Sequence, residues 1–144
     1  MIFGSDRQAL RKMWFEVYRK VQAGEPLIPL EKQISEVIAL HPEYHSMLSQ
    51  PEKYADKDYL PEFGETNPFL HMSLHMGLRE QLSNNRPAGI QSLFTQACLL
   101  KGDKHEAEHL FMEAMAEALW LAQREGRMPD EQRYLELIKR RVQA

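Results

Sequence analysis

The 144-residue sequence contains a single cysteine, Cys98, which excludes an intramolecular disulfide bond. Cys98 lies in an apolar stretch between Ala97 and Leu99, where a cysteine is typically buried and unreactive. A chain without disulfides is compatible with a reducing compartment, so we expect a cytoplasmic location. The N-terminal segment supports this expectation, because it lacks the basic start and the apolar stretch of a secretion signal.

Long hydrophobic runs and an excess of positive charge are also missing. No apolar stretch approaches the roughly 20 residues that span a membrane, so we expect no membrane insertion. The formal net charge is −3, and basic residues are interspersed with acidic ones apart from the short end Lys139-Arg140-Arg141. This charge distribution argues against nucleic-acid binding, including binding through a helix-turn-helix.

The sequence also lacks strand-like alternation, internal repeats, a glycine-rich phosphate loop and a nucleophile elbow. Apolar residues recur instead at helical spacing, and capping residues and prolines mark the helix boundaries. We predict helices over about 5–23, 30–40, 68–82, 90–100, 104–125 and 131–142. The pattern predicts an all-α fold, a single domain over residues 1–144 that forms a bundle of five to six helices.

One long loop is expected at about 51–66, because this segment is rich in proline and in charge. Its aromatic residues, Tyr54, Tyr59 and Phe63, favour packing of the loop against the body of the protein. The same three side chains could alternatively form part of a surface for a protein partner.

All six histidines of the chain occur in pairs four residues apart, at 41/45, 71/75 and 105/109. His71 and His75 are separated by just over one helical turn, so they share one face of the predicted helix. Leu74, Leu78 and Leu82 lie on the same stripe, which predicts that both histidines point into the core. They are either metal ligands or core histidines that are hydrogen-bonded to protein groups.

The pair His105 and His109 lies on the longest predicted helix, with Glu113 one turn beyond. The main apolar face of this helix lies nearly opposite the stripe that carries the two histidines. The histidines therefore either face water or lie on a helix that is buried on two sides. Trp120 shares the histidine stripe and favours burial on both sides. Glu106 belongs to a Glu-x-x-His element of the kind that binds metal in helical bundles, but it could equally complete a capping box.

The geometry of His41 and His45 is not set by their spacing alone. Pro42 disfavours the α conformation at His41, so His41 is expected to be the N-cap of a helix that begins at Pro42. His45 then falls in the following turn. His41 is therefore either a cap or a ligand.

Several segments of the sequence resemble a bacterial family of domains of unknown function, family 1841. The resemblance covers nearly the full chain and implies a small bacterial cytosolic protein, but no chemistry. The layout is more distantly similar to metal-binding bundles of the haemerythrin and ferritin type, although the sequence lacks the full ligand pattern of either. The segments that carry the family resemblance are His41-Pro-Glu-Tyr-His45, Asn67-Pro-Phe-Leu-His71-Met-Ser-Leu-His75, Arg79-Glu-Gln81, and His105-Glu-Ala-Glu-His109 through Glu113 to Trp120-Leu-Ala-Gln-Arg124.

The leading hypothesis is a metal-binding helical bundle that holds one divalent ion, zinc or non-haem iron. Water activated by such an ion would allow hydrolase or oxidoreductase chemistry, with Glu108 or Glu113 as a base. The alternative is a non-enzymatic structural or interaction protein, potentially a homodimer, in which the histidines are structural. The candidate ligands, in order of preference, are His71, His75, His109, Glu113, His45 and His41.

Overall fold

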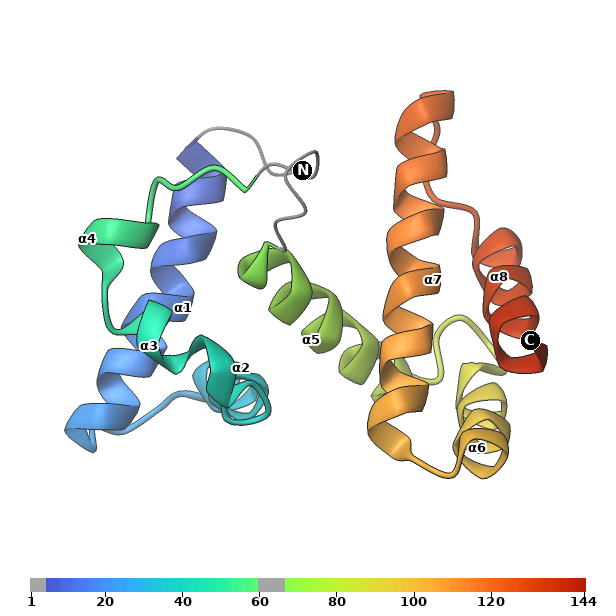
Figure 1. The fold of residues 1–144 in the computed structure, drawn as a ribbon, viewed down its shortest axis with the longest axis horizontal. Coiled ribbons are helices and arrows are strands. Elements are labelled where there is room, and N and C mark those ends of the chain that lie inside the picture. Colours follow the sequence, from blue (N-terminus) through green and yellow to red (C-terminus); the bar gives the residue numbers. More distant parts are fainter. Residues whose placement is uncertain (1–4, 60–66) are drawn as a thin grey trace. The chain divides into compact units, whose positions relative to one another are not determined.

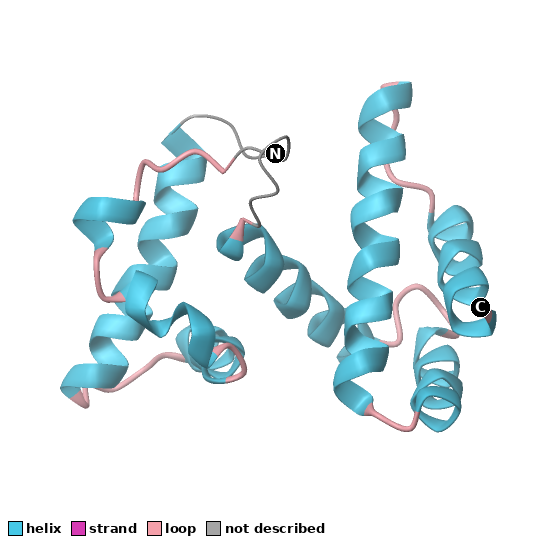
Figure 2. Ribbon diagram, viewed as in Figure 1, coloured by secondary structure: helices cyan, strands magenta, loops and turns pink. Residues whose placement is uncertain are grey.

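The structure of the chain is a computed structural model that describes residues 5–59 and 67–144. All regular secondary structure in these two ranges is helical, and neither range contains a strand (Figure 2). The all-α prediction is therefore confirmed for the described chain. Phe63 and the last part of the predicted long loop, residues 60–66, lie outside the described residues.

Eight α-helices and one short 3₁₀-helix are found in the described ranges (Figure 1). Six of the α-helices match the predicted ones, with boundaries within about two residues. Two further short helices, α3 and α4, make the predicted number of five to six too low. Together, η1 and α3 occupy the place of the helix expected to begin at Pro42, and α4 occupies the start of the segment predicted as a loop. The elements are α1 (Ser5–Ala23), α2 (Pro29–Ala39), η1 (Pro42–Tyr44), α3 (His45–Leu48), α4 (Pro51–Tyr54), α5 (Pro68–Asn84), α6 (Ile90–Lys101), α7 (Lys104–Glu125) and α8 (Glu131–Gln143).

The chain divides into two compact units, an N-terminal unit of residues 1–73 and a C-terminal unit of residues 74–144. The boundary falls inside α5, so the first residues of this helix belong to one unit and the rest to the other. In the described chain, no helix combines the length and the apolar character that a membrane span requires.

The N-terminal unit has a core built on α1, α2 and α3. Apolar residues of all three helices are almost inaccessible to solvent, and Trp14 is 1% exposed. Arg11 lies among them at 3% exposure, and its Nη1 donates hydrogen bonds to the carbonyls of Ala55 (3.1 Å) and Lys57 (2.7 Å). The guanidinium also lies 4.7 Å from the ring centroid of Phe69 and 5.7 Å from that of Tyr59. Tyr59 therefore packs against the body of this unit, as the sequence predicts.

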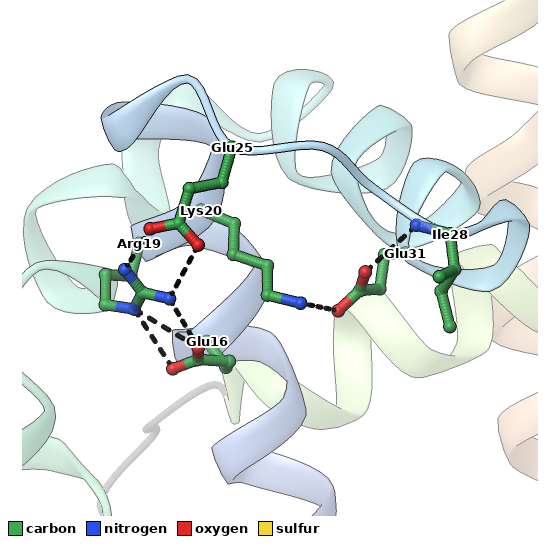
Figure 3. Close-up of polar contacts among 6 residues, drawn as sticks. All are labelled: Glu16, Arg19, Lys20, Glu25, Ile28 and Glu31. Carbon is green, nitrogen blue, oxygen red and sulfur yellow. Dashed lines mark hydrogen bonds and ion pairs between the residues drawn. The ribbon is translucent and has the colours of Figure 1, made fainter.

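Ion pairs connect α1 with the segment that leads into α2 (Figure 3). Arg19 lies 2.7 Å from Glu16 and 2.7 Å from Glu25, so one guanidinium joins a carboxylate of α1 to a carboxylate of the connector. Lys20 lies 2.8 Å from Glu31, which also accepts a hydrogen bond of 3.0 Å from the backbone N–H of Ile28 at the start of α2. These contacts explain why the connector between the two helices, residues 24–28, adopts a defined path.

The C-terminal unit is built around α7. Four alanines, at 107, 114, 118 and 122, form much of its buried face, and Phe111 lies between them at 0% exposure. Leu78 of α5, Ile90 and Ala97 of α6, and residues of α8 belong to the same buried cluster. The opposite side of α7 is open at its C-terminal half, where Trp120 is 56% exposed and lies under Arg124 at 5.3 Å. The predicted burial of α7 on two sides is therefore wrong at Trp120, because a cation from the next turn covers that ring instead of a helix.

Candidate functional site

The start of α5 sets the position of the central histidine pair. Asn67 caps the helix, and its side-chain oxygen accepts hydrogen bonds from the backbone N–H groups of Phe69 (3.0 Å) and Leu70 (3.2 Å). Pro68 occupies the first helical position, as predicted. His71 belongs to the N-terminal unit and His75 to the C-terminal unit.

In the C-terminal unit, His75 pairs with Glu108 of α7. The imidazole is fully buried, the carboxylate-bearing residue is 8% exposed, and His75 Nε2 lies 2.5 Å from Glu108 Oε2. Because an ionised carboxylate only accepts hydrogen bonds, the Nε2–H of His75 is the donor. Burial raises the pKa of Glu108, but the hydrogen bond from His75 and the charges of Lys104 and Arg79 lower it further, so the net shift is downward. The pair therefore places a carboxylate next to a hydrogen-bond donor in the buried interior of the C-terminal unit.

His109 lies beside this pair, with its ring centroid 6.1 Å from that of His75. Its Nδ1 donates a hydrogen bond of 2.9 Å to the backbone carbonyl of His105, one turn earlier on α7. That bond places the proton on Nδ1 and the lone pair on Nε2. The same tautomer is found in histidines that bind metals, whose other nitrogen donates to a carbonyl or a carboxylate.

Two other predicted residues of α7 lie at exposed positions. The side chain of Glu113 is 65% exposed, and its Oε2 lies 3.7 Å from Nε of Arg141 in α8. His105 is exposed, and its backbone N–H donates to the side chain of Asp103, the N-cap of α7. Neither side chain is buried with His75 and Glu108.

In the N-terminal unit, His41 and His71 lie together. Their ring centroids are 4.8 Å apart in an edge-to-face arrangement, and Tyr44 stacks on His41 at 5.3 Å. His41 is 2% exposed, and its Nδ1 donates to Oε1 of Glu43 at 3.0 Å. It is also the N-cap residue of η1, as predicted, although its side chain makes no capping hydrogen bond.

His45 has a different environment from the other histidine of its pair. Its Nε2 donates to the backbone carbonyl of Ile38 at 2.8 Å, and its ring lies 5.5 Å from that of Tyr18. The imidazole thus ties α3 to the end of α2.

The structure therefore brings His75 close to His109 in one unit, and His41 close to His71 in the other. Sequence reasoning considered Glu108 only as a base and did not identify it as the partner of His75. Its position held a usable signal, since it lies one turn before the buried Phe111 and therefore at the edge of the apolar face. Within residues 5–59 and 67–144, no three histidine, cysteine, aspartate or glutamate side chains are arranged as a group that could hold a metal ion.

The single thiol does not add a reactive group to either cluster. Cys98 is partly buried, which agrees in part with the predicted burial, and burial raises the pKa of its thiol. The thiol is therefore protonated at neutral pH, and a protonated thiol is a weak nucleophile.

Comparison with known proteins identifies a family. A family model described as "Domain of unknown function (DUF1841)" matches residues 6–140. No curated protein and no solved structure is significantly similar to the chain.

Proposed function

We propose that this chain, which belongs to the DUF1841 family of domains of unknown function, binds a divalent metal ion through His75, Glu108 and His109 of its C-terminal unit. The observation that carries the proposal is the buried contact between His75 and Glu108. Removing both groups from water costs free energy, and such a pair often adds little net stability. Perturbed buried pairs of this kind concentrate at functional sites.

The donor atoms fit zinc or non-haem iron. Imidazole nitrogen and carboxylate oxygen are common ligands of both ions, and the set does not distinguish between them. A bound ion would replace the proton that His75 shares with Glu108, since metal binding releases protons from its ligands. The Glu108 pKa, which is lower than usual, favours this exchange because the carboxylate is already ionised at neutral pH.

His109 is the third donor in this proposal. An imidazole nitrogen lies about 2 Å from zinc, so two rings on one ion have centroids roughly 5–6 Å apart. The separation of 6.1 Å between His75 and His109 is close to this range. The partly exposed His109 ring would turn its Nε2 toward the pair when the ion binds, which brings together the three donors that the described arrangement holds apart.

Metal analysis of untagged protein tests the proposal. We expect about one equivalent of zinc or iron, and zinc titration should show at least about a tenfold weaker affinity in His75→Ala, Glu108→Gln and His109→Ala. Glu108→Gln and His109→Ala are the critical variants, because both keep the fully buried His75 in place. His105→Ala is the matched control, since it removes an exposed imidazole one turn from His109, and it should retain binding. Absence of binding, or an equal loss in the control, would overturn the proposal.

The second candidate is a non-enzymatic structural or interaction protein. It is favoured by the local hydrogen bonds of His41 to Glu43, of His45 to Ile38, and of His109 to His105, which are typical of structural histidines. In this case a chelator leaves the melting temperature unchanged, and His75→Ala lowers stability without any change in metal content. The predicted ligand roles of His71, His45, His41 and Glu113, and the predicted homodimer, stay predictions.

A further inference from the structure

The N-terminal unit contains a large groove that is independent of the histidine clusters. Its volume is about 960 Å³, and it lies between one face of α1 and the segment from α3 to the residues after α4. On α1 the lining begins at Gln8 and ends at Ala23, and on the other side it extends from Leu48 to Asp56. At 1.5 Å per residue, the α1 side of the groove is about 22 Å long, which is close to four helical turns.

The floor of the groove is apolar. Phe15 and Leu48 line it and are 7% and 2% exposed, so they are also part of the core of this unit. Tyr18, Pro51 and Ala55 add further apolar surface. The groove is open to solvent along one side, whereas small-molecule sites usually enclose about 70–90% of the ligand surface.

The two rims carry different charges. On the α1 rim, Arg19 forms ion pairs of 2.7 Å with Glu16 and with Glu25, and Lys12 adds one exposed cation. On the opposite rim, Glu52 and Asp56 are exposed carboxylates four residues apart, and Asp56 accepts a hydrogen bond from the neutral amide of Gln8 at 2.7 Å. The rim of residues 52–56 is therefore acidic.

The lysines next to this rim are engaged with aromatic rings. Lys53 lies 5.3 Å from the ring centroid of Tyr54, and Lys57 lies 5.7 Å from that of Tyr54 and 5.0 Å from that of Tyr59. Neither lysine lines the groove. The acidic character of the rim is thus retained on the groove side.

We propose that this groove binds an amphipathic helix of a partner protein, with its apolar face against Phe15, Tyr18 and Leu48 and with lysine or arginine side chains against Glu52 and Asp56. The length of the groove matches about four turns of such a helix, and its open side leaves the polar face of the helix in water. The acidic rim selects a basic helix and sets its orientation across the groove.

Synthetic peptides provide the probe. The first is a fluorescent 16-residue helix with leucine at i, i+3, i+4 and i+7 spacing and with lysines beside the leucine stripe. The second has glutamate in place of each lysine, and the third has the composition of the first in scrambled order. We expect the basic helix to bind best in anisotropy titrations, with at least about tenfold tighter affinity than the acidic one at low salt and a smaller difference at high salt. Amide chemical-shift changes should fall on residues 8–23 and 48–56.

Charge reversal on the protein is the decisive variant. Glu52→Lys combined with Asp56→Lys changes only exposed side chains, and it should reverse the preference so that the acidic helix binds better. Glu80→Lys combined with Glu136→Lys makes the same change of net charge in the C-terminal unit and should leave the preference unchanged.

Three results would overturn the proposal. The first is equal binding of the basic and scrambled peptides, and the second is a preference that does not change in the rim variant. The third is occupation of the groove by something else. A fatty-acid site would be indicated if dodecanoate shifts the same amide signals while no helix binds. A second copy of the chain would be indicated by concentration-dependent dimerisation that the rim variant abolishes.

Discussion

At the scale of single residues, Arg11 shows how one buried charged side chain can fix the position of a segment that has no regular secondary structure. Residues 55–59, which follow α4, form no helix or strand, yet two of their carbonyls, at Ala55 and Lys57, accept hydrogen bonds from its guanidinium. The aliphatic stem and the planar head fit into an aromatic environment where lysine, with its compact charge, would not.

Arg11→Ala is therefore expected to destabilise the N-terminal unit by about 2–4 kcal/mol, since it leaves two carbonyls without their donor and removes the packing on Phe69. Urea unfolding monitored by circular dichroism measures the change. Lys12→Ala, which removes the neighbouring exposed cation, should alter stability by no more than about 0.5 kcal/mol. If Arg11→Ala lowers stability as little as Lys12→Ala does, the segment after α4 does not depend on these hydrogen bonds.

Residue-scale contacts were also the least predictable from the sequence. The stripe of His71 and His75 with Leu78 indicated burial, and His75 is indeed fully buried. The identity of its partner was not predictable, because Glu108 is 33 positions away and helical periodicity carries no information about which helices meet. Spacing along one helix was no better guide for Glu113. It lies one turn from His109, and yet its side chain pairs with Arg141 of α8.

At the scale of elements, the long helices were predictable because their ends carry strong local signals. Helix α5 begins after Asn67, α7 after Asp103 and α8 after Asp130. In each case the side-chain oxygen of the cap accepts a hydrogen bond from a backbone N–H of the first turn. Gly126 ends α7 in a left-handed conformation (φ 66°) that other residues adopt only with strain. Pro42 likewise marked the start of η1, whereas α4 was not predicted, because its proline, Pro51, is also typical of loops.

The link between α1 and α2 should depend on pH through Glu31. The hydrogen bond from Lys20, followed by that from the backbone of Ile28, lowers the pKa of Glu31 below its ordinary value of 4.5. A carboxyl whose folded pKa is depressed contributes stability above its unfolded pKa and loses it as the pH falls through its folded pKa. Glu31→Gln should therefore lower the melting temperature at pH 7, and the difference from the wild type should shrink as the pH falls below about 4.5.

Melting curves of both proteins between pH 3 and pH 7 test this expectation. Glu52→Gln serves as the control, because it removes an exposed carboxylate from the same unit. A difference between Glu31→Gln and the wild type that stays constant down to pH 3 would contradict the assignment.

At the scale of the whole molecule, the division into two units has a direct experimental consequence. Among the described residues, the members of the buried cluster in the C-terminal unit all lie between positions 78 and 142. A domain of this size can form a stable core by itself. The sequence did not predict the division, because α5 crosses it as an uninterrupted helix and no linker marks it.

A fragment of residues 67–144, which keeps the Asn67 cap, should therefore fold alone. We expect a helical circular dichroism spectrum, a cooperative thermal transition and dispersed amide signals. A shortened fragment of residues 90–144, which lacks Leu78 and the rest of α5, is the comparison and should lose cooperativity. A disordered 67–144 fragment would mean that its core needs the first 66 residues.

The alanines along the buried face of α7 also constrain how this sequence can drift over time. Each of the four alanines is at most 6% exposed, and a larger side chain in a packed interior costs about 1–3 kcal/mol. Proteins that descend from the same ancestor should thus favour small residues there, even where their surfaces have diverged beyond recognition. This row of small residues is a mark by which distant members of the family could be identified.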